Sequence, residues 1–147
     1  MYAHVLVPTD GTELSNKAVK EAARLAKTAG SRLLILHVRS PIDMPHHVEG
    51  GALTRMPNES LMAEIESEER TLLDVAIKIA EAEGVQAETA FTAGYAPSEA
   101  IIRIAAEQQC DAIVMASHGR SSLAALVLGS ETHKVLTQTK IPVLVVR

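Results

Sequence analysis

The amino-acid sequence predicts one α/β domain over residues 1–147, built on a doubly wound parallel sheet of five strands in the order 3-2-1-4-5 with helices on both faces. Short, continuously apolar runs alternate along the chain with longer segments whose apolar residues recur at helical spacing. Strands that are apolar on both sides are typical of parallel sheets covered by helices. The length of 147 residues suits a single domain with one good core.

The N-terminal half is expected to hold two strands and two helices. The apolar run over 5–7 predicts a buried strand, and helical spacing then extends over 14–29. Gly30 follows where a helix C-terminus favours a positive φ. A second apolar strand is predicted over 33–38, and a long amphipathic helix over 59–83 has its glutamates early, as the helix dipole favours.

The C-terminal half begins with a different pattern. Apolar and polar residues alternate over 85–91, which predicts an edge strand with one wet face. A helix is predicted over 97–109, with a proline in its first turn, and a third apolar strand over 112–115. The last helix is expected to begin near Ser130, and a final apolar strand occupies 143–146.

The segment 39–58 fits neither periodicity. It contains three prolines and two adjacent glycines. A connection of this length without secondary structure is uncommon in a compact domain unless it is functional or mobile. We therefore interpret it as a flexible crossover or lid.

Composition and charge limit the classes of partner that the protein is expected to bind. The net charge is −4, aromatic residues make up 2% of the chain, and tryptophan is absent. Nucleic acids are bound by clustered Lys and Arg and by aromatic side chains that stack on bases, so this class of partner is disfavoured. The chain shows no signal peptide and no apolar stretch of the roughly 18 residues that a membrane span needs. The single cysteine, Cys110, is expected to be a small buried hydrophobe in a cytoplasmic protein.

Two polar loops follow predicted strands at places where ligands bind in open α/β sheets. Such ligands lie beyond the carboxyl ends of strands, at the point where the strand order reverses. One loop spans 8–12 and the other 116–122. If the first and fourth strands are neighbours, both loops open into one crevice.

The segment 117–132 has the features of a phosphate-binding loop. Gly119 allows the backbone amides to turn toward an anion, and Arg120 adds a fixed positive charge. Gly129 and Ser130 then begin a helix whose free N–H groups and positive dipole end face the same place. The segment therefore predicts an anion site.

Plainer structural roles remain open for these residues. Gly129 and Ser130 would also suit an ordinary helix start, and Gly119 a simple turn. Asp10 could cap the first helix, a role that Thr12 could fill as well. The combination of two glycines after a buried strand is what favours a ligand site.

The segments that carry this pattern resemble the universal stress protein family. The resemblance is clearest over 7–11, 112–120, 128–130 and 141–146, and it extends along the whole chain. Nucleotide-binding members of that family carry Gly-x-x-Gly, nine residues, then Gly-Ser or Gly-Thr. Here Gly119 is the second glycine of the pattern, and nine residues separate it from the closing Gly-Ser pair.

Ala116 stands where the pattern has its first glycine. If the backbone there must take a positive φ, alanine costs about 1 kcal/mol. If the backbone is extended, the methyl group is only a small intrusion on a ligand.

The resemblance implies a site for ATP. Asp10 matches the acidic residue beside the ribose or the metal-bound phosphates, and it would contact Mg²⁺ only through the nucleotide. Pro8 and Thr9 would line the adenine side, and the backbone of Val38 would read the adenine edge. The triphosphate region would be formed by Ala116, Ser117, His118, Gly119, Arg120, Gly129, Ser130, Glu131 and Thr132.

The leading hypothesis is a cytoplasmic stress-response protein that binds ATP with Mg²⁺ and acts as a nucleotide-dependent regulatory homodimer. The resemblance implies that the dimer forms through strand 143–146. His118 could act as an acid or base, or only as a hydrogen-bond donor, and no general base is evident, so any ATPase activity should be slow. The alternative is a dimeric interaction module that binds no nucleotide. A substrate-adenylating enzyme is disfavoured, because 8–12 lacks the Ser-Gly-Gly-x-Asp-Ser loop of such relatives.

Overall fold

Five parallel strands form one sheet, in the order β3-β2-β1-β4-β5. The computed structural model describes residues 1–40, 59–119 and 127–147. The predicted fold class and strand order are confirmed. The strands are β1 (His4–Pro8), β2 (Arg32–Arg39), β3 (Ala87–Ala93), β4 (Ala112–Ala116) and β5 (Val143–Val146).

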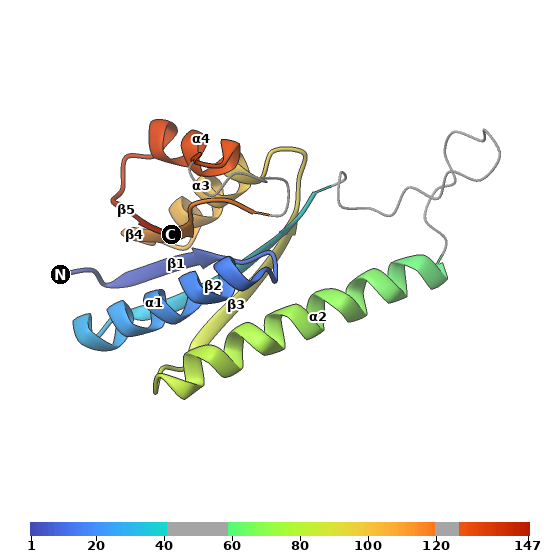
Figure 1. Cartoon of the computed structure of the whole chain (residues 1–147), viewed down its shortest axis with the longest axis horizontal. Coiled ribbons are helices and arrows are strands. Elements are labelled where there is room, and N and C mark those ends of the chain that lie inside the picture. Colours follow the sequence, from blue (N-terminus) through green and yellow to red (C-terminus); the bar gives the residue numbers. More distant parts are fainter. Residues whose placement is uncertain (41–58, 120–126) are drawn as a thin grey trace.

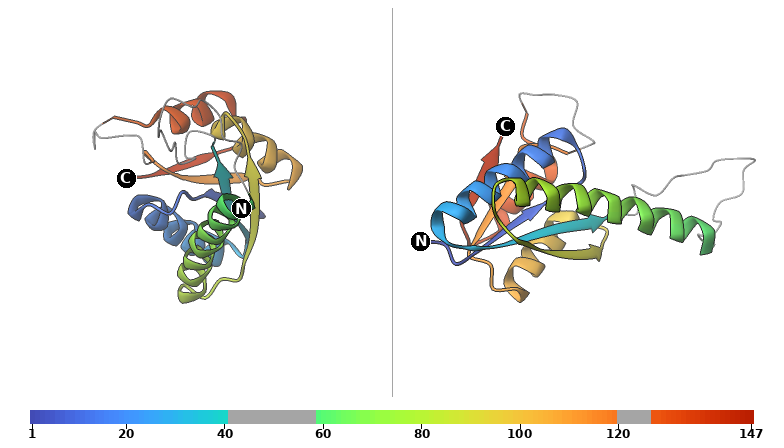
Figure 2. Two further views of the ribbon diagram at one scale, coloured as in Figure 1. Left: turned by 90° about the vertical axis from the view of Figure 1, so that its right-hand side faces the viewer. Right: turned by 90° about the horizontal axis from the view of Figure 1, so that it is seen from below.

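Two helices cover each face of the sheet. They are α1 (Glu13–Ala29), α2 (Glu59–Ala82), α3 (Pro97–Glu107) and α4 (Ser130–Gln138). Figures 1 and 2 show α1 and α2 on one side and α3 and α4 on the other. The first half of α2 extends beyond the carboxyl ends of the strands (Figure 2). None of the helices in the described ranges combines the length and the apolar character that crossing a membrane requires.

The strands are buried on both sides because successive side chains point to opposite faces. Val5 and Val7 pack with α1 and α2, whereas Leu6 between them packs with α3 and α4. Along β2, Leu33 and Ile35 belong to the first of these cores. Most residues that α1 buries against the sheet are alanines, which let the helix approach closely: Ala18, Ala22, Ala23 and Ala26.

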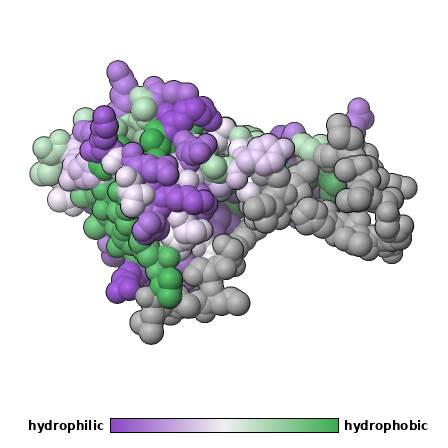
Figure 3. All heavy atoms as spheres, turned by 90° about the horizontal axis from the view of Figure 1, so that it is seen from above, coloured by the Kyte–Doolittle hydropathy of each residue, from purple (hydrophilic) through white to green (hydrophobic). Residues whose placement is uncertain are grey.

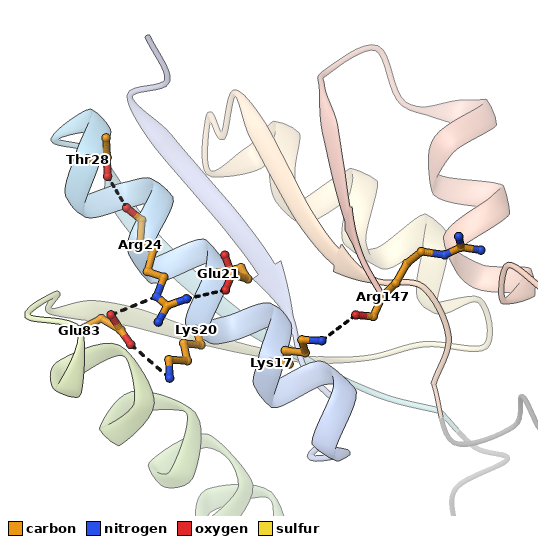
Figure 4. A network of polar contacts seen from close by, with 7 residues as sticks. All are labelled: Lys17, Lys20, Glu21, Arg24, Thr28, Glu83 and Arg147. Atoms are coloured by element: carbon orange, nitrogen blue, oxygen red, sulfur yellow. Dashed lines mark hydrogen bonds and ion pairs between the residues drawn. The ribbon is translucent and has the colours of Figure 1, made fainter. Parts of the chain in front are cut away.

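The outer face of α1 is charged, and it connects distant parts of the chain (Figure 4). Glu83 accepts a hydrogen bond from Arg24 at 3.3 Å and lies 3.7 Å from the Lys20 ammonium. Lys17 donates to the backbone carbonyl of Arg147 at 2.8 Å. Exposed contacts of this kind are screened by solvent and contribute little to stability, so the buried alanine face holds the helix in place.

Element boundaries differ from the predicted ones mainly at β3. The strand begins at Ala87 because the amide of Val85 donates to the carbonyl of Ala80 at 3.0 Å and so closes the end of α2. β3 is an edge strand, as predicted, and most of its side chains are half-buried or exposed. Of the predicted flexible segment 39–58, Arg39 belongs to β2, and 41–58 lie outside the described residues.

Cys110 is buried, as expected. Burial raises the pKa of its thiol to about 11. A thiol with so high a pKa is almost entirely protonated near neutral pH and is a poor nucleophile.

Candidate functional site

The sheet opens at the point where its strand order reverses. β1 pairs with β2 along its whole length, from His4 to Pro8. Its pairing with β4 is limited to Val5 with Ala112 and Leu6 with Ile113. The last residues of β1 and β4 are therefore not paired with each other, and the loops that follow the two strands start side by side. Crevices of this kind are where open α/β sheets bind ligands.

The two loops approach each other closely at Asp10 and Gly119. A methyl group on Gly119 would lie 2.8 Å from Oδ2 of Asp10, which is closer than a carbon and an oxygen normally approach. A larger residue here would require the Asp10 carboxylate to move. The loops after β1 and β4 thus lie against each other at the switch point, where a ligand crevice is expected.

Asp10 does not cap α1. Thr12 is the N-cap residue, and its hydroxyl accepts a hydrogen bond from the Ser15 amide at 3.2 Å. Oδ1 of Asp10 accepts from the Thr12 amide at 3.0 Å and from the Thr12 hydroxyl at 2.6 Å. Oδ1 is therefore held on the α1 side, and Oδ2 lies on the Gly119 side.

Gly129 brings the start of α4 against the loop that follows β4. Its amide donates to the Ser117 carbonyl at 2.7 Å, and a methyl group at this position would lie 3.0 Å from Cα of His118. Gly129 is also the N-cap of α4, and among the described residues no side-chain cap hydrogen bond is made at this helix start. An uncapped helix start offers N–H groups and a positive dipole end to an anion.

Three of the predicted site residues are buried, and they support the crevice rather than line it. The Thr9 hydroxyl lies 3.1 Å from the Ser15 hydroxyl, under the start of α1. The Ser117 amide donates to the carbonyl of Val146 at 2.8 Å. Thr132 donates to the carbonyl of Ala116 at 2.9 Å and so fastens α4 to the end of β4.

Ala116 is the last residue of β4 and pairs with Val146 in the sheet. Within the described part of the chain, Gln109 is the only non-glycine residue with a positive φ. Alanine at 116 therefore carries no backbone strain. Its backbone is extended, so the only difference from glycine here is the small methyl group.

Glu131 points away from the crevice, toward α3. Its Oε2 accepts from the Ser98 amide at 2.7 Å, and its Oε1 lies 3.1 Å from the Lys134 ammonium. The N-cap residue of α3 is Ala96, whose methyl side chain cannot accept a hydrogen bond. Glu131, from α4, therefore caps that helix. Partial burial alone would raise the pKa of Glu131, but the hydrogen bond from Ser98 together with Lys134 holds it below its usual value.

Replacing Glu131 with glutamine should lower stability in a way that depends on pH. Because the folded-state pKa of Glu131 is lowered, its charge stabilises the fold above the unfolded-state pKa, near 4.5, and this contribution is lost as the pH falls through the folded-state pKa. We expect a lower melting temperature than wild type at pH 7 and a gap that narrows as the pH falls below the unfolded-state pKa. A gap of equal size at pH 7 and pH 3 would contradict this account.

The remaining predicted residues occupy different positions. Pro8 ends β1, and Val38 lies near the end of β2, partly buried and packed against the core beneath α3 and α4. His118 is half-buried, with Nδ1 3.2 Å from the Ser117 hydroxyl. Ser130 is exposed at the start of α4. Arg120 lies outside the described residues.

A second space adjoins the crevice on the side of α1 and α2. This cavity of about 490 Å³ lies between the start of α1, the end of β2 and the first half of α2. Among the predicted site residues that the structure describes, Asp10 alone lines it. Over the described ranges, no group of three His, Cys, Asp or Glu side chains is arranged to hold a metal ion.

Sequence reasoning missed His37, which lines this cavity and is hydrogen-bonded to the loop after β1. The available signal was a histidine within the otherwise apolar run of β2. A buried imidazole in a strand requires a polar partner, and that partner is identified only by the fold.

These features define a class of protein. It is a doubly wound α/β domain whose two glycine-containing loops meet at the switch point of its sheet. The model of the universal stress protein family matches residues 1–147, and the chain belongs to this family.

Individual relatives agree with this assignment. The chain is 35% identical to the universal stress protein YxiE of Bacillus subtilis over 151 aligned residues, which cover all of both chains. It superposes on the solved structure of protein MJ0577 with a TM-score of 0.81 and 27% identity, covering 99% of this chain and 96% of that one. It is also similar to a universal stress protein solved in complex with cAMP, with a TM-score of 0.71, 28% identity and coverage of 99% and 97%.

Proposed function

We propose that this protein binds ATP in the crevice between the loops that follow β1 and β4, and that it acts as a nucleotide-dependent regulatory protein in the stress response. The observation that carries the proposal is the close approach of Asp10 and Gly119 at the switch point, beside the start of α4, whose N-cap residue is a glycine. The crevice combines backbone N–H groups for phosphates with a carboxylate on the opposite wall. A related protein of 28% identity was solved with a nucleotide, cAMP, which supports the same ligand class here.

The described residues fit a nucleotide phosphate chain. Glycine at 119 and 129 lets the two loops and the start of α4 pack closely together, so that backbone N–H groups gather where phosphates would bind. The amides at the start of α4 and the Ser130 hydroxyl would hold the phosphates. The end of β2, at Val38, would lie on the base side.

Magnesium would enter with the triphosphate. Asp10 is the one carboxylate that we assign to it, and a single carboxylate is too small a ligand set for Mg²⁺ without phosphate oxygens. The ion would neutralise charge on the phosphates. We infer slow or absent hydrolysis, since His118 is the nearest candidate base and its Nδ1 lies beside the Ser117 hydroxyl.

We further propose a homodimer that forms through β5. β5 is an edge strand, and Leu144 on it is 49% exposed. Figure 3 shows a hydrophobic band on the side of the molecule away from α2. Exposed apolar edges favour pairing with another strand, and a second copy supplies an identical one. We place this dimer in the cytoplasm, where its single thiol would stay reduced.

An isothermal titration with ATP, with and without Mg²⁺, tests the proposed function. We expect saturable binding below about 1 mM, which corresponds to roughly 4 kcal/mol, and tighter binding with Mg²⁺. Inorganic tripolyphosphate is the matched ligand without a base, and it should bind more weakly. Release of phosphate from ATP, followed in the same samples, should be slow.

The alternative is a dimeric interaction module that binds no nucleotide. It predicts no heat of binding at millimolar ATP together with an intact dimer in sedimentation experiments. Such a result would exclude the nucleotide function.

A further inference from the structure

His37 connects β2 to the loop that forms one wall of the crevice. Its imidazole is almost fully buried, and Nδ1 lies 2.9 Å from the carbonyl oxygen of Thr9. A carbonyl oxygen can only accept a hydrogen bond, so His37 carries a proton on Nδ1 and donates it. The bond crosses 28 residues of sequence and joins two neighbouring strand ends.

The ring of His37 is fixed on two further sides. Phe91 lies directly opposite on β3 and stacks with it, with ring centroids 6.0 Å apart and an angle of 28° between the planes. Nε2 of His37 lies 3.8 Å from a carboxylate oxygen of Glu69 on α2. Since Phe91 and Glu69 come from different elements, the ring has little freedom to turn.

Arg39 holds Glu69 in this place. Its guanidinium donates to the two carboxylate oxygens at 2.6 and 2.7 Å, a two-pronged contact of the strong, charge-assisted type. The same guanidinium lies 4.8 Å from the centroid of Phe91. Both side chains of the ion pair are largely buried. The four residues form one packed cluster behind the loop.

Thr9 is the residue through which the cluster contacts the loop after β1. The Thr9 amide donates to the Leu36 carbonyl at 2.8 Å, and its hydroxyl accepts from the Gly11 amide at 3.3 Å. With its carbonyl bound by His37, the peptide that joins Thr9 to Asp10 has a fixed orientation. The direction in which the Asp10 carboxylate leaves the backbone depends on that peptide.

We propose that His37 is a positioning residue of the nucleotide site: by holding the Thr9 carbonyl, it aims Asp10 at the phosphate side of the crevice. This inference rests on the proposed function for its effect on binding. Its effect on the loop can be measured in the protein without nucleotide.

Two substitutions separate the donated hydrogen bond from the packing of the ring. His37→Phe keeps an aromatic ring beside Phe91 but has no donor. His37→Asn loses the ring but places an amide N–H near the position of Nδ1. We expect His37→Phe to weaken ATP binding about fivefold, the loss typical of one hydrogen bond, and His37→Asn to stay within about twofold of wild type.

His4→Phe is the matched control. His4 is also a buried histidine with Nδ1 3.0 Å from a backbone carbonyl, that of Gln108, but it begins β1, at the opposite end of the strands from the crevice. Its substitution should lower the melting temperature and leave ATP affinity unchanged. If His4→Phe and His37→Phe lost ATP affinity equally, the loss would come from a general decrease in stability, and the proposal would be overturned.

Amide hydrogen exchange in the nucleotide-free protein gives the second readout. We expect faster exchange at Gly11 and Thr12 in His37→Phe and near wild-type exchange in His37→Asn. The proposal is wrong if both variants exchange and bind like wild type, or if His37→Asn is the more impaired of the two. If wild type itself fails to bind ATP, the proposed function fails, and the exchange rates still decide whether His37 orders the loop.

Discussion

Replacing Gly119 with alanine should weaken ATP binding about tenfold and change the free energy of unfolding by less than about 0.5 kcal/mol. The added methyl group would lie 2.8 Å from Oδ2 of Asp10, so the carboxylate must move. Oδ1 is already held by the Thr12 amide and hydroxyl, and any movement strains those bonds. Gly119 is exposed and its φ is not positive, so the fold itself loses little.

Gly94→Ala is the control for this substitution. It also adds one methyl group to a glycine that follows a strand, but that methyl would meet only Cβ of Ala100, at an ordinary 3.9 Å. Calorimetric titration and denaturant unfolding should show Gly94→Ala close to wild type in both affinity and stability. Unchanged ATP affinity in Gly119→Ala would mean that the phosphates bind elsewhere.

Replacing Gly129 with alanine should have a larger effect, because the new methyl group would meet backbone instead of a side chain. It would lie 3.0 Å from Cα of His118 and 3.2 Å from the Ser117 carbonyl oxygen. Relief requires moving the start of α4 away from the loop after β4, which weakens the 2.7 Å hydrogen bond from the Gly129 amide. We expect no saturable binding at millimolar ATP and a stability loss of about 1–2 kcal/mol, typical of overpacking.

The two variants can be compared directly by thermal unfolding with and without ATP. Wild type should gain melting temperature with ATP, Gly119→Ala should gain less, and Gly129→Ala should start lower and gain nothing. A Gly129→Ala protein with wild-type stability would show that the contact relaxes at no cost, and our account of this turn would then be wrong.

Most of the fold could be predicted from the sequence because each strand is a short apolar run and each helix has its own apolar face. Alternate residues of β1 and β2 enter different cores, so strands buried on both sides had to lie between two helical layers. The wet face of β3 identified it as an edge strand. Its first residue was predicted two positions early, since nothing in the sequence shows that Val85 closes the turn after α2.

The candidate site could be predicted in part. The spacing of Gly119 and Gly129 indicated a loop that needs small residues, and the structure explains both by close contacts. The partners of polar side chains were not predictable, because they come from elements far apart in the sequence. The contact of Glu131 with the start of α3 could not be foreseen, and His37 was overlooked because Thr9 lies 28 residues away from it.

The burial of Cys110 has a practical consequence for solution studies of the crevice. With a pKa of about 11, only roughly one molecule in 10,000 carries a thiolate at pH 7, and the sulfur is shielded as well. Cys110 is also the only cysteine of the chain. A cysteine introduced at an exposed position would therefore react alone with a maleimide dye, and a fluorophore or spin label could be attached beside the crevice without first removing a native thiol.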